Sequence, residues 1–393
     1  MNKKKSAILY ILLSVFSVVF LFFGNRIATK DAVMFTGQTG QQTETYVAHV
    51  DLILDTTETT TKISDTFSTT ETKIKFTATV LFGARRGDTL AVYQSYDDLT
   101  NRIPTPVRAG DWVLVHLTPE TSDTYYAGEI VRIQVILVAA LIFFLLLIIF
   151  ARLKGVATVA ALLLSVLSIF LVFIPSILSG RNVYASAFLI CIYTILITPF
   201  FIGGFNRKSV ASAIGCIGGV ALAGVLAAFL NSYMRITGAV DDETMAVAFI
   251  LKEGSIDLRA IVFASVLIGA LGACLDVSMS ISSAIYEMKA LSEKKYFGDL
   301  FKSGLNLGWD IMGTQISTLV LAYIGGSLSV VLLLVAYQNS VLEMLNREVV
   351  IIELLQMLVG CFTILFTIPA TAFVSAAMFS GGTGRRQRHR YRT

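Results

Sequence analysis

The chain has 393 residues, of which 55% are hydrophobic and only 15% are charged, and its formal net charge is +4. Soluble globular proteins carry about 25% charged residues, so this composition excludes an ordinary soluble domain and indicates an integral membrane protein. The positive balance is concentrated in sequences such as the tail RRQRHRYR beside an apolar segment, which favours contact with anionic membrane lipid, and no nucleic-acid partner is predicted.

The first predicted element is an apolar run at Ala7–Gly24 that follows three lysines. This arrangement is also found in cleaved signal peptides. No small-x-small cleavage site follows in VFLFFGNRIA, however, and the run is longer than a usual signal core. We therefore predict an uncleaved membrane anchor over residues 1–25.

Residues 26–130 differ from the rest because they are acidic and rich in threonine. Runs such as YVAHVDLIL, KIKFTATVLF, TLAVYQSY and DWVLVHL alternate or are β-branched, and turn sequences such as ARRGD and RAGD join them. This pattern predicts a small β barrel or sandwich outside the cytoplasm. The apolar-poor stretch Asp55–Lys73 is predicted to be a long loop.

Catalytic motifs are absent from this β-rich segment. It has no GxSxG, no HExxH and no cysteine, because Cys191, Cys216, Cys274 and Cys361 all lie in apolar runs further along the chain. A binding, gating or assembly role is therefore predicted for residues 26–130, and no catalytic residue is assigned.

Eight apolar runs are long enough to cross about 30 Å of hydrocarbon, which takes about 20 helical residues. They are Ala7–Gly24, Val131–Phe150, Val156–Leu178, Val183–Phe205, Val210–Leu230, Ala260–Ser282, Ile311–Tyr337 and Val349–Phe379. The chain is thus predicted to be an α-helical integral membrane protein with about eight transmembrane helices. Its parts are an anchor (1–25), a β-rich extracytoplasmic domain (26–130), a seven-span membrane domain (131–380) and a basic cytoplasmic tail (381–393).

Lysine and arginine predict the orientation, because basic loops are retained in the cytoplasm. With both termini inside, nearly all basic clusters fall on the cytoplasmic side, including Lys294, Lys295 and the C-terminal tail. The reverse topology would place these clusters outside. We therefore predict a multi-pass protein of the cell membrane with residues 26–130 on its outer side.

Two carboxylates, Asp276 and Asp310, lie in apolar sequences that contain several polar residues, GACLDVSMSISSA and LGWDIMGTQIST. An ionised side chain at membrane depth costs about 3 kcal/mol and usually marks function. No lysine or arginine lies inside a predicted span to neutralise them. Each must bind a cation, share a proton or lie at the inner water boundary.

Helical spacing places polar neighbours beside both carboxylates. The predicted depths of Asp276 and Asp310 agree as well, since both fall in the inner layer of consecutive spans. Hydroxyl and amide oxygens suit a Na⁺, Mg²⁺ or proton site, while the identity of any metal stays unknown and no resident cofactor is predicted. The predicted cation or proton site consists of Asp276, Asp310, Ser280, Thr314, Gln315 and Ser317.

Other polar and small residues have a structural interpretation. Polar side chains hold membrane helices together, so packing explains the hydroxyls as well as a site does. The repeat of Ala211, Gly215, Gly219 and Ala223 is interpreted as helix packing. The pair Gly325-Gly326 interrupts a predicted span, and interrupted helices are frequent at transport sites.

These sequences resemble a known family. GACLDVSMSISSAIYEM, followed after a basic loop by GWDIMGTQISTLVLAYIGGSLSVVLLL, is similar to the YibE/F family of bacterial multispanning membrane proteins. The anchor and outer domain resemble the YibE type. The resemblance implies a bacterial cell membrane and a shorter YibF-type protein as membrane partner, but no established activity.

Three functions are compatible with these features. The first is a transporter or permease, with or without coupling to an ion or proton, that has Asp276 and Asp310 in its site. The second is a non-catalytic component of a membrane complex that binds an envelope partner through the β domain. The third is an intramembrane aspartyl protease with both aspartates as its dyad; the YD and GxGD motifs of such enzymes are not matched by the LD and GWD found here.

Overall fold

A computed structural model describes residues 3–30, 45–64, 67–82, 85–97, 105–117, 125–239, 257–291, 296–336 and 340–380. Its contacts divide the chain into two compact units. One is Met34–Leu147, and the other combines Met1–Val33 with Ile148–Thr393. The N-terminal helix therefore belongs to the same unit as most of the predicted membrane domain, although the β-rich segment separates them in the sequence.

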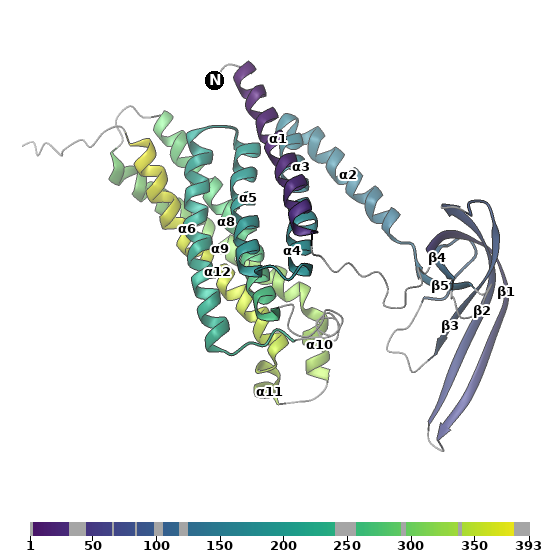
Figure 1. Cartoon of the computed structure of the whole chain (residues 1–393). Helices are drawn as coiled ribbons and strands as arrows, with labels where there is room; N and C mark the ends of the chain where they lie inside the picture. The colour runs from purple at the N-terminus through teal and green to yellow at the C-terminus, as the bar shows by residue number, and fades with distance from the viewer. Residues whose placement is uncertain are drawn as a thin grey trace, which may run out of the picture. The chain divides into compact units, whose positions relative to one another are not determined.

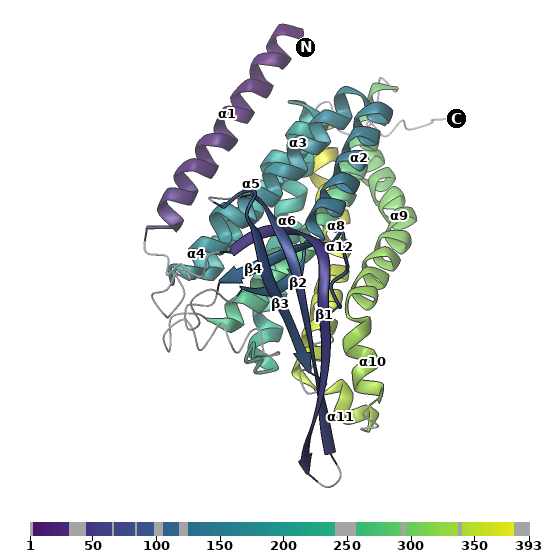
Figure 2. The same cartoon turned by 90° about the vertical axis from the view of Figure 1, so that its right-hand side faces the viewer.

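Helices and strands follow one another as Figures 1 and 2 label them. In chain order they are α1 (Lys3–Ala28), β1 (Thr45–Ser64), β2 (Phe67–Phe82), β3 (Thr89–Asp97), β4 (Trp112–Leu117), β5 (Tyr125–Ile130), α2 (Ile133–Ala151), α3 (Leu153–Ser168), the π-helix η1 (Ile169–Phe173), α4 (Ile174–Leu178), α5 (Val183–Gly203), α6 (Arg207–Tyr233), α8 (Leu258–Ala290), α9 (Phe297–Gly326), α10 (Leu328–Ala336), α11 (Val341–Leu345) and α12 (Glu348–Phe379).

The smaller unit contains a closed barrel with the strand order β1-β2-β3-β5-β4, in which β4 also pairs with β1. Strands β3 and β5 run parallel, whereas the other pairs are antiparallel. Alternate residues point inward, so that Val50, Phe76, Val92 and Val113 are completely buried. The predicted barrel or sandwich is thus a barrel, and its strand order is that of an OB fold. A fold of this kind does not itself identify a ligand.

Two predicted turns of the barrel are confirmed. Gly87 in ARRGD has a φ of 93° between β2 and β3, and Gly110 in RAGD has a φ of 95° before β4. Both angles lie in the left-handed region that glycine adopts without strain. Strand β5 was not predicted, because YYAGEI is short and contains glycine and glutamate, yet it pairs with both β3 and β4.

The prediction of a loop over Asp55–Lys73 is wrong. Strands β1 and β2 continue through this stretch as a long antiparallel hairpin, with Thr57 opposite Lys73 and Thr61 opposite Thr69. Figure 2 shows the hairpin extending beyond the other strands of the barrel. Low apolar content indicated a loop, but threonine is β-branched and favours extended strands even where no apolar core is formed.

Within the described residues, the larger unit and α2 supply seven helices that are long and apolar enough to cross a membrane. They are Ile8–Ala28, Ile133–Ala151, Leu153–Leu178, Val183–Gly203, Arg207–Tyr233, Leu258–Ala290 and Glu348–Phe379. The prediction of a mainly α-helical membrane protein with a small β-rich part is therefore confirmed in outline.

The predicted span Ile311–Tyr337 is divided between two helices. α9 ends at Gly326, Ser327 lies at the junction, and α10 has only nine residues. Charged and polar side chains such as Asp310 and Gln315 interrupt α9, and α10 is too short, so neither helix alone is among the seven apolar ones. The predicted Gly-Gly interruption coincides with this junction.

The core of the larger unit lies among α6, α8 and α12, which contact one another (Figure 1). Gly215 and Gly219 of α6 face Thr371 and Thr367 of α12 so closely that a Cβ would not fit. The interpretation of the small-residue repeat as helix packing is therefore confirmed. Close backbone approach through small residues is a common way for membrane helices to associate.

Helix α1 belongs to the larger unit, where it packs against η1 and α5. The ring of Phe20 stacks on Tyr193 of α5, with centroids 4.2 Å apart. Arg181, just before α5, donates to the carbonyl of Ile27 at 2.9 Å. Ser17 is completely buried and donates to the carbonyl of Leu13 at 2.9 Å, so it leaves no unpaired donor in this contact.

Candidate functional site

Asp276 lies near the middle of α8, on the face of this helix that is turned away from the core. Its neighbours Leu275 and Val277 are buried, whereas Asp276 and Ser280 are exposed. One residue step turns a helix by about 100°, which explains this alternation of faces. Among the described residues, none forms a hydrogen bond or ion pair with the Asp276 carboxylate.

Asp310, Thr314 and Ser317 lie on one exposed face of α9, and Gln315 beside them is half-buried. Thr314 donates to the carbonyl of Ile311 at 2.8 Å, and Ser317 donates to that of Gly313 at 2.8 Å. These hydroxyl protons are therefore satisfied within the helix itself. The oxygen lone pairs remain available, so the hydroxyls can still accept a bond or contact a cation.

Two contacts set the relative level of α8 and α9. Gly304 lies against Ile285, and Gly269 lies against Tyr323, so these neighbouring helices run antiparallel. Counting residues from these contacts places Asp276 level with Thr314 of α9. Asp310 precedes Thr314 by one helical turn, which is roughly 6 Å along the axis at 1.5 Å per residue.

The two carboxylates do not point in the same direction. Thirteen residues separate Asp310 from Tyr323, which corresponds to a rotation of about 140° around α9. Tyr323 faces α8, whereas Asp310 faces away from it; Asp276 shares its face of α8 with Gly269, which meets Tyr323. The structure brings the two aspartates to a similar level but not into contact. A dyad that shares a proton requires contact between carboxylates, so this arrangement gives the protease alternative no support.

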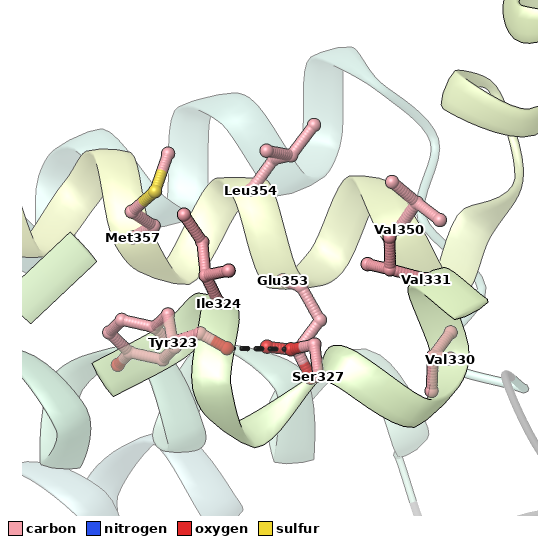
Figure 3. A pocket seen from close by; sticks show the side chains of 9 residues that line it. All are labelled: Tyr323, Ile324, Ser327, Val330, Val331, Val350, Glu353, Leu354 and Met357. Carbon is pink, nitrogen blue, oxygen red and sulfur yellow. Dashed lines mark hydrogen bonds between the residues drawn. The ribbon is translucent and has the colours of Figure 1, made fainter. Parts of the chain in front are cut away.

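Sequence reasoning missed a third carboxylate, Glu353, near the start of α12. It is half-buried and lines a small cavity of about 80 Å³ at the junction of α9 and α10, as Figure 3 shows. Ser327 lines the same cavity and donates to the carbonyl of Tyr323 at 3.0 Å. The sequence IIELL held the signal, because Glu353 is the single acidic residue within the apolar run Val349–Phe379.

Polar contacts continue from this cavity toward α8. Gln356, one turn after Glu353, donates to the hydroxyl of Ser265 at 2.8 Å. Ser265 precedes Gly269 and Asp276 on α8. A series of polar and small residues therefore extends from Glu353 to Asp276, and no basic residue described here pairs with either carboxylate.

Metal binding by protein side chains alone is not indicated in the described part of the chain. There, no group of three or more histidine, cysteine, aspartate or glutamate residues could hold a metal ion. The sequence places no histidine in a span, and in the barrel His49 lies 3.2 Å from Asp51 while His116 lies 3.0 Å from Thr45. The predicted Na⁺, Mg²⁺ or proton coupling at Asp276 and Asp310 thus stays a prediction.

Comparison with known proteins places most of the helical part in one family. Residues 139–381, more than half of the chain, match the family described as YibE/F-like protein. No curated protein and no solved structure matches the chain.

Proposed function

Because the chain belongs to the YibE/F-like family, whose matched region holds most of its membrane-crossing helices, we propose that it is a transporter or permease of the bacterial cell membrane. Its transport is coupled to a small cation or to protons. The observation that carries this proposal is Asp276 at mid-helix in α8, exposed and without a basic partner among the described residues. Lipid cannot solvate such a carboxylate, so water, a cation or a proton must do so.

The proposed topology has eight crossings, with α9 and α10 together forming the seventh. Both termini are cytoplasmic and the barrel is extracytoplasmic, as the distribution of lysine and arginine favours. The division at Ser327 supports a transport role because interrupted helices are frequent at transport sites. In this proposal Glu353 lies near the outer end of the path, and Asp276 and Asp310 lie deeper.

Purified protein in liposomes tests this proposal. Asp276→Asn and Asp310→Asn remove a charge with almost no change in size, and Asp299→Asn makes the same change on the exposed first turn of α9. We expect the first two variants to lose at least tenfold in Na⁺, Mg²⁺ or proton flux, with Asp299→Asn close to wild type. Wild-type flux in both aspartate variants would contradict the proposed site.

A second function, a binding component of a membrane complex, is favoured by the long β1–β2 hairpin. Its strands pair through partners such as Thr60 with Thr70, residues 55–61 of β1 are exposed, and no described residue of 55–73 belongs to the hydrophobic core of the barrel. The proposed partner is an envelope protein or a YibF-type membrane protein. Replacing residues 59–71 by a two-residue turn joins the paired residues Glu58 and Thr72 and keeps the strand register. This change should abolish co-purification of the partner while flux is retained; co-purification that survives it argues against binding through this hairpin arm.

A further inference from the structure

A cavity lies between the N-terminal part of α1, the start of α3 and the end of α5. It consists of two adjoining spaces of about 510 and 310 Å³, which share Tyr10, Lys154 and Ile202 in their walls. Volumes of this size are typical of sites for small organic ligands, which occupy about 300–1,000 Å³. All the wall residues belong to the larger compact unit.

The smaller space is polar. Lys154 is exposed and forms no ion pair with the described residues, and the Tyr10 hydroxyl lies close to Gly204. Gly204 has a φ of 73°, and a Cβ there would stand 3.4 Å from the Tyr10 hydroxyl. Lys154 and Tyr10 thus line one space, and an ammonium and a phenol group can both donate hydrogen bonds to an anion.

The start of α6 adds positive potential at the same place. Asn206 precedes α6 and lines the smaller space, but its amide donates to the carbonyl of Gly203 at 2.9 Å instead of capping the helix. The first N–H groups of a helix have no partner within it, and the helix dipole makes this end positive. Together with Lys154, this helix end favours an anionic group such as phosphate.

The larger space is apolar and suits a hydrocarbon chain. Its walls are formed by Val156, Ala157 and Ala160 of α3 and by Phe201 of α5. The alanines leave the space open because their side chains are small. Since α3 begins and α5 ends here, the cavity has its polar part at the helix ends and its apolar part along the helices, as the headgroup and tail of a lipid are arranged.

We propose that this cavity binds an anionic phospholipid. The phosphate contacts Lys154 and Tyr10 near the start of α6, and one acyl chain lies along Ala157 and Ala160. A phosphatidylcholine headgroup binds less well because its trimethylammonium would lie beside the Lys154 ammonium. Basic pockets between membrane helices are a known mode of anionic lipid recognition, and one lysine near the surface contributes about 1 kcal/mol.

Native mass spectrometry of the full-length protein tests the headgroup contact. Phosphatidylglycerol or phosphatidylcholine is added to delipidated protein, and bound lipid is counted. We expect phosphatidylglycerol to bind more tightly, and Lys154→Gln to weaken it roughly fivefold. Lys302→Gln, on an exposed lysine of α9 that does not line the cavity, should leave binding unchanged. Equal losses in both variants would overturn the proposal.

A second pair of measurements separates lipid from free phosphate. Ala157→Phe fills the apolar space without changing any charge, so we expect it to reduce phosphatidylglycerol binding while the melting temperature stays within a few degrees of wild type. Inorganic phosphate at millimolar concentration should not displace the lipid. Displacement by phosphate together with unchanged binding to Ala157→Phe would show a phosphate site without an acyl-chain site, and the lipid assignment would be wrong.

Discussion

The hydroxyl of Tyr323 on α9 occupies the space that a side chain at Gly269 of α8 would need. This contact fixes the level of the two helices that carry the predicted site. Asp276 lies two helical turns from Gly269 on the same face of α8, about 10 Å along the axis at 1.5 Å per residue. The contact between Tyr323 and Gly269 therefore determines which part of α9 lies opposite Asp276.

The contact predicts a specific pair of stability changes. A methyl group at Gly269 meets only the hydroxyl oxygen too closely, since the next ring atom of Tyr323 is 3.5 Å away. Gly269→Ala should cost about 1–3 kcal/mol of stability. Tyr323→Phe in the same chain should restore most of it, because it removes that oxygen. Thermal unfolding in detergent of both single variants and the double variant measures the coupling.

The control for this cycle is Gly272→Ala on the same helix, because no atom lies within 4 Å of its Cβ position. We expect its unfolding temperature to equal that of wild type or to rise slightly, since alanine favours helix over glycine. If the effects of Gly269→Ala and Tyr323→Phe simply add, the two residues are not in contact.

Packing between α6 and α12 predicts a second difference between adjacent glycines. A Cβ at Gly219 would overlap the Thr367 hydroxyl and approach the Cys274 sulfur to 3.2 Å, whereas a Cβ at Gly218 would meet only Ala370 at 3.6 Å. Gly219→Ala should therefore destabilise the protein by about 1–3 kcal/mol, and Gly218→Ala should not. Comparison of their unfolding temperatures checks this; equal values would mean that α6 and α12 are further apart.

Local patterns in the sequence predicted much of the fold, but not the directions of side chains on α9. Period-two alternation identified four barrel strands, and glycines in ARRGD and RAGD identified their turns. The hairpin arm was missed because it contributes no apolar residue to the core of the barrel, so its sequence lacks the apolar alternation of the other strands. The direction of Asp310 could not be predicted, since it depends on which face of α9 packs against α12 through Gly308. Glu353 was missed because it lies near the end of an otherwise apolar run.

The barrel predicts a pH-dependent contribution to stability. Thr79 donates to Asp51 at 2.7 Å and lowers the pKa of that carboxyl below its usual value of 3.8, and His49 acts in the same direction. A carboxyl with a lowered folded pKa stabilises the fold at pH values above its unfolded pKa. This stabilisation disappears as the pH falls through the folded pKa. Thr79→Val should therefore destabilise the barrel at pH 7 and have less effect below pH 3.8.

The measurement uses Trp112 fluorescence of the barrel in a Trp309→Phe background, at pH 7 and at about pH 3. Thr77→Val is the matched control on β2, because Thr77 donates to the carbonyl of Leu52 at 3.4 Å and not to a carboxylate. Its effect should be the same at both pH values. If Thr79→Val lowered the stability of the barrel equally at both pH values, the Thr79 hydroxyl would not stabilise the ionised form of Asp51.

Glu353 predicts a gain in stability when its charge is removed. It is half-buried beside an apolar cavity, and no described residue donates to its carboxylate. An ionised side chain costs about 3 kcal/mol at the centre of a span and less near its end. Because Glu353→Gln removes this cost, it should stabilise the protein by about 1 kcal/mol. Glu343→Gln on the exposed helix α11 should change nothing. Thermal unfolding in detergent measures the stability of both variants. A loss of stability in Glu353→Gln would mean that the carboxylate is held by a cation or a donor.

In the liposome assay Glu353→Gln should lower flux, because the proposed path passes this cavity.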